Sequence, residues 1–285
     1  MNILLTGASG FTGRHFMEAA TRAGHTVVPL RAELADPVQI EAEVTQAQPD
    51  AVVHLAAISY VAHADTSALY AVNTVGTTHL LAAVAALRKV PRCVLLASSA
   101  NVYGNCNSSP IAETQIPAPV NHYAMSKLAM EHMARTYADR LPLIITRPFN
   151  YTGPGQAPQF VIPKMVEHYA RKLPHIDLGN IHVEREFNDV RMVCEAYLAL
   201  LSHGQAGEVY NICTGHPYTL QQVMDALAGL TGHRLQVRAN RELVRATEVH
   251  RLCGNPGKLQ AATGLDLRRY GLMATLQTML EQVHA

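Results

Sequence analysis

Three kinds of side chain that could move a proton lie in one stretch of the chain, from Ala97 to Lys127. Tyr123 and Lys127 are four residues apart, so on a helix their side chains share one face. An ammonium beside a phenol favours the phenolate and lowers a pKa that starts at about 10. A serine after an apolar strand, Ser98 or Ser99, could hydrogen-bond the same substrate oxygen. Together these residues predict proton transfer on a carbonyl or alcohol, which is half of a hydride transfer, although an exposed Tyr–Lys pair is usually only solvated.

The element that would position a cofactor for such a transfer lies at the N-terminus. An apolar strand over Asn2–Thr6 is followed by Gly7, Gly10 and Gly13 and by a helix that runs to Ala23. In a dinucleotide site the first glycine allows the tight turn, the second lets the backbone approach the pyrophosphate, and the third lets the helix pack on the strand. The phosphates then lie at the helix N-terminus. The order of strand, glycine-rich turn and helix therefore predicts dinucleotide binding.

The end of the second expected strand bears on which dinucleotide is bound. The strand Thr26–Leu30 is followed by Arg31 and, two residues later, by Glu33. An arginine here can bind the 2′-phosphate of NADP, whereas an acidic residue can bind the ribose hydroxyls of NAD. Arg31 therefore favours NADP(H), and Glu33 leaves NAD(H) possible.

Strand and helix patterns alternate through the first half of the chain. The expected elements after residue 48 are a continuously apolar strand Asp50–Ala57, a helix Thr66–Arg88, a strand from Cys93, a helix from His122 to about Arg140 and a strand Leu143–Thr146. A continuously apolar strand is typical of a parallel sheet covered on both faces. The alternation predicts an α/β fold with a Rossmann-type doubly wound parallel sheet.

The regular alternation of strand and helix patterns ends near residue 150. We expect residues 1–150 to form a dinucleotide-binding domain and residues 151–285 to form mainly a smaller C-terminal substrate-binding α/β portion. Segments at about 185–215 are expected to return to the Rossmann core. The smaller portion should close over the carboxyl ends of the strands, where ligands bind in open α/β sheets.

Composition excludes several classes of partner. The formal net charge is +1 and no Lys/Arg block occurs, so neither nucleic acid nor a membrane surface is expected to bind. The five cysteines are odd in number and lack C-x-x-C spacing, which argues against a disulfide framework or zinc site and favours a cytoplasmic protein. The fifteen histidines are scattered, so we expect surface histidines and no metal. No apolar run approaches about 18 residues, so no membrane span is expected.

A series of motifs resembles the extended short-chain dehydrogenase/reductases, the NAD-dependent epimerase/dehydratase family of nucleotide-sugar enzymes: Gly7-x-x-Gly10-x-x-Gly13, Asn73, Ser99 and Tyr123-x-x-x-Lys127. The resemblance implies that Ser99 and Tyr123 contact the sugar 4-position, while Lys127 holds the nicotinamide ribose and depresses the tyrosine pKa. Ser99 takes this role, not Ser98, because it stands five residues before Gly104. The implied cofactor-binding residues are Gly7, Gly10, Phe11, Gly13, Arg31, Glu33, Leu34, Leu55, Ala56, Ala57, Asn73, Tyr123, Lys127 and Pro148.

The C-terminal part is most similar to GDP-mannose 4,6-dehydratases and GDP-6-deoxymannose reductases. Segments 147–156 and 160–164 look like those that GDP-sugar members place against the diphosphate and nucleotide. Arg185 is implied to hold a phosphate through its planar fork, although out of context it would be a surface ion pair with Glu186 or Asp189. The implied substrate-binding residues are Ser99, Asn101, Tyr123, Asn150, Phe160, Lys164, Arg185, Arg245 and Glu248.

Asn101 bears on the choice of reaction. The family's dehydratases place a Glu, and its epimerase-reductases a Cys, two residues after the catalytic Ser or Thr to remove the C5 proton. An amide cannot act as a base near pH 7. We therefore predict NAD(P)H-dependent reduction of the 4-keto group of a GDP-4-keto-6-deoxy-hexose, forming GDP-6-deoxy-D-mannose (GDP-D-rhamnose). The alternatives are an NDP-sugar 4-epimerase with tightly bound NAD and a catalytically silent, dinucleotide-sensing member. The resemblance also implies a homodimer formed through the helices expected at 66–88 and 122–140.

Overall fold

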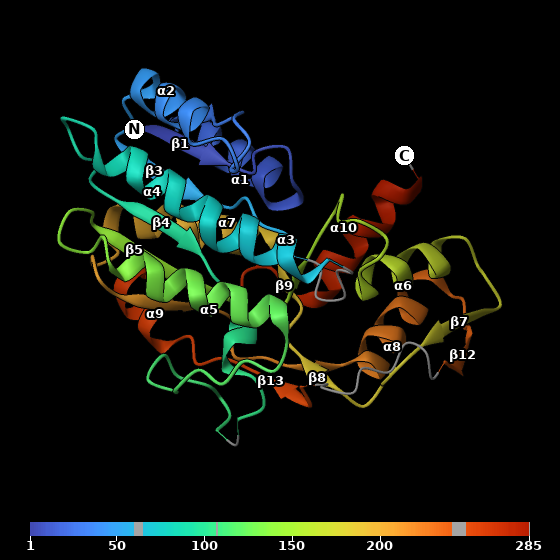
Figure 1. Ribbon diagram of the computed structural model, residues 1–285. Coiled ribbons are helices and arrows are strands. Elements are labelled where there is room, and N and C mark those ends of the chain that lie inside the picture. The colour runs from blue at the N-terminus through green and yellow to red at the C-terminus, as the bar shows by residue number, and fades with distance from the viewer. Residues whose placement is uncertain (60–64, 107, 241–248, 285) are drawn as a thin grey trace.

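A six-stranded parallel sheet forms the centre of the larger part of the molecule, with the strand order β10-β5-β4-β3-β1-β2 (Figure 1). The computed structural model describes residues 1–59, 65–106, 108–240 and 249–284. The strands of this sheet are β1 (Asn2–Thr6), β2 (Thr26–Pro29), β3 (Ala51–His54), β4 (Val94–Ala97), β5 (Leu143–Pro148) and β10 (Val209–Ile212). Every neighbouring pair runs parallel. Because β3 lies beside β1 on the side away from β2, the chain winds outward in two directions from β1, and the predicted doubly wound Rossmann-type sheet is confirmed.

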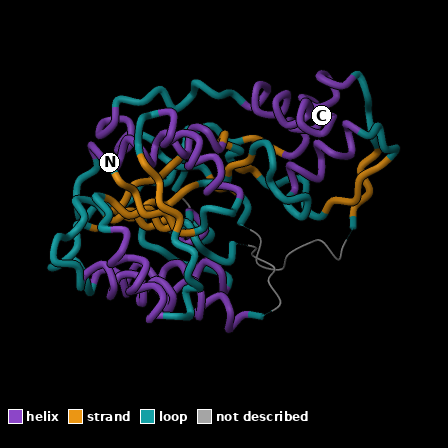
Figure 2. The backbone as a smooth tube through the Cα atoms, turned by 90° about the horizontal axis from the view of Figure 1, so that it is seen from above, coloured by secondary structure: helices purple, strands orange, loops and turns teal. Residues whose placement is uncertain are grey.

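Helices cover both faces of the sheet (Figure 2). Alternate residues of β1 point to opposite faces, with Ile3 and Leu5 in one buried cluster and Leu4 in the other. The helices of the first face are α1 (Phe11–Arg22), α7 (Val190–His203) and α9 (Gly257–Thr263). The helices of the second face are α2 (Pro37–Ala47), α4 (Thr77–Ala85) and α5 (His122–Arg135). Both faces of the strands are therefore buried, which explains their continuously apolar sequences.

The helix expected over 66–88 has an internal irregularity. It consists of α3 (Thr66–Tyr70), a π-helical turn Ala71–Gly76 and α4, and it ends at Ala85. The stretch Thr66–Ala85 has the length, 20 residues, and the mean hydropathy, 1.2, of a membrane-crossing helix, contrary to the expectation that no such stretch exists. Within the protein it packs against α2 and α5, and 44% of its apolar window is buried, as in the core helices of many proteins. The predicted lack of a membrane partner stays a prediction.

Helix α5 begins where a side chain caps it. The Asn121 side-chain oxygen accepts a hydrogen bond of 2.9 Å from the backbone N–H of Ala124, which satisfies one free donor of the first turn. Tyr123 and Lys127 therefore lie in the first turns of this helix. The helix ends at Arg135, and residues 136–140, expected to be helical, form turns instead.

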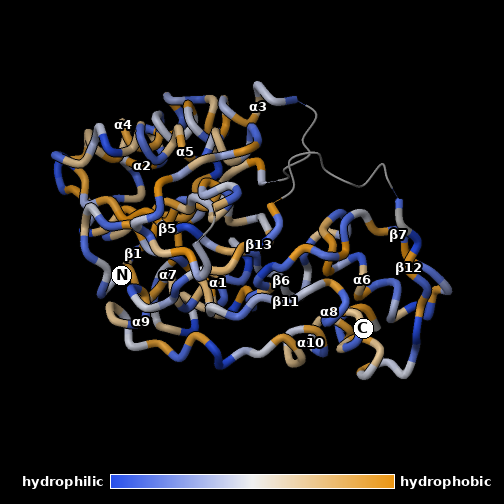
Figure 3. The backbone as a smooth tube through the Cα atoms, turned by 90° about the horizontal axis from the view of Figure 1, so that it is seen from below, coloured by the Kyte–Doolittle hydropathy of each residue, from blue (hydrophilic) through white to orange (hydrophobic). Residues whose placement is uncertain are grey.

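The C-terminal elements have a hydrophobic core of their own, which includes Met165, Val223, Leu227 and Leu276. Its helices are α6 (Val161–Ala170), α8 (Leu220–Thr231) and α10 (Leu272–His284), beside the paired strands β7 (His175–Leu178) and β12 (Gln236–Ala239). Orange and blue segments alternate along helices in Figure 3, the pattern of helices that bury one face.

Very short strands connect this C-terminal core to the sheet. They are β6 (Tyr151–Thr152), β8 (Glu184–Arg185), β9 (Asn188–Asp189), β11 (Tyr218–Thr219) and β13 (Arg251–Leu252). β6 pairs with β9, and β8 pairs with both β11 and β13. None of them was expected from sequence, because two residues carry no periodic pattern.

Candidate active site

The predicted site residues follow the carboxyl ends of several central strands. Gly7 follows β1, Leu55 follows β3, Ser99 comes two residues after β4, and Pro148 ends β5. Since these strands are parallel, their carboxyl ends meet at one edge of the sheet. The fold thus brings residues from the first half of the chain to the edge where such sheets bind ligands.

The glycine-rich turn between β1 and α1 is packed too closely for side chains. Gly7 has φ +71°, and a Cβ there would lie 2.7 Å from the backbone nitrogen of Ala56. A Cβ on Gly13 would lie 2.1 Å from the carbonyl oxygen of Gly7. Helix α1 starts at Phe11 with no acidic residue in its first turn and no side-chain cap, so its first N–H groups and the positive end of its dipole suit a phosphate. The turn fits the pyrophosphate of a dinucleotide.

The next strand end is tied to the same turn by a hydroxyl. Thr6 Oγ1 accepts hydrogen bonds from the backbone N–H groups of Leu55, at 3.2 Å, and Ala56, at 3.0 Å. Ala57 continues this loop without regular structure. Of the three residues after β3 that were predicted to bind cofactor, Leu55 and Ala56 therefore lie directly against the glycine-rich turn.

One histidine contradicts the expectation of surface histidines. His54 is 2% exposed, and its Nδ1 and Nε2 form hydrogen bonds with Thr6 Oγ1 at 2.7 Å and Thr77 Oγ1 at 2.8 Å. Thr77 in turn donates to the carbonyl oxygen of Asn73 at 2.8 Å. Burial, with a smaller effect of the nearby Lys127 ammonium, lowers the pKa of His54 to about 3. His54 is therefore a neutral structural link beneath the site.

The residues expected near the adenine ribose differ in burial. Arg31 and Glu33 are both exposed after β2, and the backbone N–H of Arg31 donates to the Glu43 carboxylate at 2.7 Å. Leu34 is buried against helix residue Gly76, where a Cβ would lie 2.6 Å from the Leu34 Cβ. Arg31, the candidate for binding a 2′-phosphate, and Glu33, the candidate for binding the ribose hydroxyls, are thus both at the surface.

Asn73 lies in the π-helical turn and is 1% exposed. Its Oδ1 accepts from the Ile58 N–H at 2.9 Å, and its Nδ2 donates to the Ile58 carbonyl at 3.1 Å and to Ser126 Oγ at 3.0 Å. Ser126 precedes Lys127, so Asn73 joins the loop after β3 to the helix that carries Tyr123 and Lys127. Its predicted contact with cofactor stays a prediction.

Ser99, Tyr123 and Lys127 are all buried, with exposed fractions of 5%, 7% and 4%. Burial raises the pKa of Tyr123, and a hydrogen bond with Ser99 only partly offsets this rise. The expected lowering of that pKa by Lys127 is not found in this structure, because burial is the largest influence on Tyr123 and the influence that opposes it is the hydrogen bond with Ser99. Lys127 Nζ donates to the carbonyl oxygen of Ala97 at 2.7 Å, and burial lowers the pKa of Lys127 to about 8. Near pH 7 the phenol keeps its proton and can act as a general acid.

Asn101 contacts the serine of this set. It lies in a 3₁₀ turn, Ala100–Tyr103, and both its backbone N–H and its Nδ2 donate to Ser99 Oγ at 3.2 Å. The position that would supply a C5 base therefore carries an amide that orients Ser99.

The other predicted substrate residues come from the C-terminal portion. Asn150 is exposed, and its carbonyl oxygen accepts from Asn188, while Phe160 is the N-cap of α6. Lys164 Nζ donates to the Asp177 carbonyl oxygen at 2.7 Å. Arg245 and Glu248 lie outside the described residues.

Arg185 is only 9% exposed and donates to the carbonyl oxygens of Glu184, at 3.0 Å, and Val249. The alternative of a surface ion pair required an exposed side chain, whereas Arg185 is buried. Glu186 beside it is fully buried and accepts hydrogen bonds from the backbones of Thr214 and Gly254, both at 2.7 Å. Arg185 is thus held in place by its buried position on β8.

Two functional candidates were missed by sequence reasoning, Glu131 and its partner Arg147. They form a buried bidentate ion pair, with Nη2 to Oε2 at 2.6 Å. Arg147 therefore points into the protein core, although its segment was expected to line the diphosphate. The signal for Glu131 was its spacing, since it follows Tyr123 by eight and Lys127 by four residues on one helical face.

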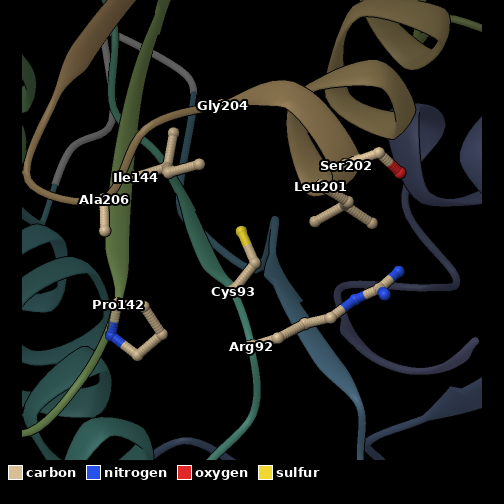
Figure 4. Close-up of a pocket in the computed structure, with 8 residues that line it drawn as sticks. All are labelled: Arg92, Cys93, Pro142, Ile144, Leu201, Ser202, Gly204 and Ala206. Atoms are coloured by element: carbon tan, nitrogen blue, oxygen red, sulfur yellow. The ribbon is translucent and has the colours of Figure 1, made fainter.

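A cavity of ≈ 260 Å³ lies away from this site (Figure 4). Its lining includes Cys93, just before β4, and Pro142, just before β5, with Gly204 after α7. These are the amino ends of the strands, the edge opposite to Ser99 and Pro148. The cavity is thus no part of the candidate active site.

Three comparisons relate the chain to known proteins. It is 34% identical to a GDP-6-deoxy-D-talose 4-dehydrogenase from Aggregatibacter actinomycetemcomitans over 98% of this chain and 97% of the relative. It is 36% identical to a GDP-6-deoxy-D-mannose reductase from Pseudomonas aeruginosa over 92% of this chain and 90% of the relative. The structure of RMD from Pseudomonas aeruginosa complexed with NADPH superposes with a TM-score of 0.91 at 33% identity, covering 100% of both chains.

The doubly wound sheet, the glycine-rich turn and the Ser/Tyr/Lys set define a dinucleotide-dependent oxidoreductase. The sequence model of the NAD dependent epimerase/dehydratase family matches residues 3–213. The chain belongs to this family.

Proposed function

We propose that this protein reduces the 4-keto group of a GDP-4-keto-6-deoxy-hexose with a reduced nicotinamide dinucleotide and forms GDP-6-deoxy-D-mannose. The observation that carries the proposal is the buried set at the carboxyl edge of the sheet, in which Tyr123 keeps its proton and Asn101 occupies the position of a C5 base. Both relatives described above are named for oxidation or reduction involving a GDP-6-deoxy sugar, and the name of the Aggregatibacter relative gives position 4.

The protein's own groups would act on the carbonyl oxygen. Ser99 Oγ and the Tyr123 hydroxyl bind O4 of the sugar, and Asn101 orients Ser99 through its two hydrogen bonds. A reduced nicotinamide held at this edge of the sheet would supply the hydride that C4 receives. The O–H bond of Tyr123 breaks, its proton passes to O4, and the phenolate that remains is stabilised by the Lys127 ammonium. The products are a secondary alcohol and the oxidised dinucleotide.

The remaining residues are assigned to binding. We place the pyrophosphate of the cofactor on Gly7, Gly10, Phe11 and Gly13, and its adenosine between Arg31, Glu33 and Leu34. Arg185 and Arg245 would bind the sugar diphosphate. The other substrate contacts in this proposal are Asn150, Phe160, Lys164 and Glu248. Residues 1–150 thus serve the dinucleotide and residues 151–285 mainly the nucleotide sugar.

The preferred cofactor in this proposal is NADP(H). Arg31 is an exposed cation at the end of β2, where a 2′-phosphate would lie, and the Pseudomonas structure described above is complexed with NADPH. Replacing Arg31 by Ala should lower kcat/KM for NADPH more than for NADH, whereas Glu33→Gln should not. Equal losses for both cofactors in the Arg31 variant would contradict the preference.

The direct test is an assay of GDP-4-keto-6-deoxymannose with NADPH and with NADH. We expect stoichiometric loss of nicotinamide absorbance and a single product. The H3–H4 coupling in its NMR spectrum separates the 6-deoxymannose product, with a large coupling, from its C4 epimer 6-deoxytalose, with a small one. No consumption with either cofactor would refute the proposal.

Two outcomes of the same experiments would favour the alternatives. Purified protein that retains NAD and interconverts NDP-sugars without added cofactor would be a 4-epimerase. Unchanged biological function of a Tyr123→Phe variant would indicate a catalytically silent member.

We also propose a cytoplasmic homodimer without nucleic-acid or membrane partners. Helices α4 and α5 lie side by side (Figure 1), and the surface they share with the π-helical turn exposes Val75 by 50% and Met125 by 44%. All five cysteines are free thiols, as a reducing compartment would keep them. Light scattering of the purified protein and of a Val75→Asp/Met125→Asp variant tests the dimer, because two charges in a packed interface should yield monomers.

A further inference from the structure

A buried charge cluster lies beneath the candidate active site. Its centre is Glu131, which is 1% exposed and stands on α5 one turn after Lys127 and two turns after Tyr123. The three side chains therefore form a row along one face of the helix.

The Glu131 carboxylate joins the ends of two strands to this helix. Ser98 Oγ donates to Oε1 at 2.5 Å, and Arg147 donates from Nε to Oε1 at 2.9 Å and from Nη2 to Oε2 at 2.6 Å. Hydrogen bonds to a carboxylate are roughly twice as strong as neutral ones, and the two bonds from Arg147 also fix its plane. Ser98 immediately precedes Ser99 at the end of β4, and Arg147 precedes Pro148 on β5. Movement of this carboxylate would therefore displace the serine that binds O4.

Glu131 also balances two buried cations, Arg147 and Lys127. The Arg147 guanidinium lies over the Tyr103 ring, 4.8 Å from its centroid, and is 3% exposed. Of the groups that face Lys127, His54 on β3 is neutral at pH 7, and the carbonyl oxygen of Ala97 is uncharged. Tyr123 is neutral until it gives up its proton, and the negative charge of Glu131 is the influence that raises the pKa of Lys127 against burial.

We propose that Glu131 is a positioning residue of the reduction: through Ser98 it fixes the place of Ser99, and through its charge it keeps Lys127 cationic when Tyr123 transfers its proton. The inference rests on the proposed function. The Tyr123 O–H bond breaks, its proton goes to O4 of the sugar, and the phenolate is left beside Lys127. A neutral Lys127 could not stabilise that phenolate, so the loss of charge at residue 131 should reduce turnover most at alkaline pH.

The first readout needs no turnover. The chain has five lysines, Lys89, Lys127, Lys164, Lys172 and Lys258, so ¹³C/¹⁵N-lysine NMR resolves few signals, and a Lys127→Arg variant identifies the one of interest. We expect the wild-type Lys127 signal to titrate near the pKa of about 8. In Glu131→Gln the titration should move down by about one unit or more, as expected when a unit charge one helical turn away is removed. The alkaline limb of kcat/KM should move with it.

Two further variants separate charge from shape. Ser98→Ala removes a hydrogen bond and leaves the Glu131 charge in place, so Lys127 should titrate as in the wild type while kcat falls by roughly tenfold or less. Glu131→Gln leaves Arg147 buried without its counter-charge, which can unfold a protein. Glu131→Gln/Arg147→Met removes the whole ion pair and should still move the Lys127 titration down, by less than Glu131→Gln does, because the repulsion from Arg147 is lost as well.

The outcomes are distinct. An unmoved Lys127 titration in the double variant, or an unmoved alkaline limb in a protein that turns over the GDP-keto sugar, overturns the inference about Glu131. A shifted Lys127 signal in a protein that consumes no GDP-keto sugar supports the effect of the Glu131 charge on the Lys127 pKa. It refutes the proposed reduction instead. A shifted signal together with a shifted alkaline limb supports both.

Discussion

Replacing Glu186 by Gln should destabilise the protein, although the two side chains have nearly the same shape. The Glu186 carboxylate is fully buried and accepts hydrogen bonds from Gly254 N–H at 2.7 Å, Thr214 N–H at 2.7 Å, Thr214 Oγ1 at 3.1 Å and Gly215 N–H at 3.3 Å. It thereby joins β8, which carries Arg185, to the segments that follow β10 and β13. In a glutamine, an NH₂ group would replace one of the two carboxylate oxygens. It would face the N–H donors that bind this oxygen, and it could accept no hydrogen bond from them.

The expected loss follows from opposing contributions. Hydrogen bonds to a charged group contribute about 1.5–3 kcal/mol each, so the two bonds of 2.7 Å together contribute about 3–6 kcal/mol. Burial raises the pKa of Glu186, which means that desolvation of its charged form exceeds what these hydrogen bonds contribute. Gln removes that desolvation cost, but its NH₂ group would face backbone N–H donors, and a buried polar group left without a partner costs about 1–3 kcal/mol. We therefore expect a net loss of about 2 kcal/mol in the free energy of unfolding.

Urea unfolding measures this loss, and a control, Glu184, lies two residues earlier on β8. Glu184 forms an ion pair with Arg251, and their side chains are 37% and 49% exposed. Exposed pairs contribute about 0–1 kcal/mol, so Glu184→Gln should change the unfolding midpoint little. Equal effects of the two substitutions, or a Glu186→Gln variant as stable as the wild type, would refute the assignment of Glu186 as a structural clamp.

Three further perturbations test other parts of the structure. Gly13→Ala places a methyl group 2.1 Å from the Gly7 carbonyl oxygen and should weaken NADPH binding at least tenfold by fluorescence titration, whereas Gly229→Ala, where a Cβ meets no atom within 4 Å, should leave the affinity unchanged. Tyr123→Phe should lower kcat by roughly 10²–10⁴-fold with NADPH affinity retained, and Tyr137→Phe, farther along the chain, should retain full activity. Because the folded pKa of His54 is about 3 against 6.5 unfolded, its contribution to stability is complete above pH 6.5 and is lost as pH falls toward 3. Between pH 7.5 and 5.5 this loss should be about 1.4 kcal/mol, and the urea midpoint of a His54→Gln variant should depend less on pH over that interval.

Sequence patterns predicted the elements that are determined by interactions between residues close together in the chain. The positions of β1, α1, β3 and α5 followed from apolar runs, glycines and helical spacing, which act over a few residues. The helix ends were less predictable: α5 stops at Arg135, five residues short of the expected end, because no periodic signal marks the turns that follow. The two-residue strands β8, β11 and β13 exist only because partners distant in the sequence lie beside one another.

The sequence by itself determined the class of fold and the chemical groups of the candidate site. Gly7, Gly13 and the Tyr123–Lys127 pair are recognisable because turns and helices bring close neighbours together by rule. The tertiary structure decided what surrounds those groups. Burial raises the pKa of Tyr123, makes His54 a neutral link and encloses Glu131 with Arg147, and burial depends on residues far apart along the chain. The spacing that placed Tyr123 beside Lys127 could not show that desolvation would raise the pKa of the phenol, because desolvation is a property of the packed protein and not of the helix alone.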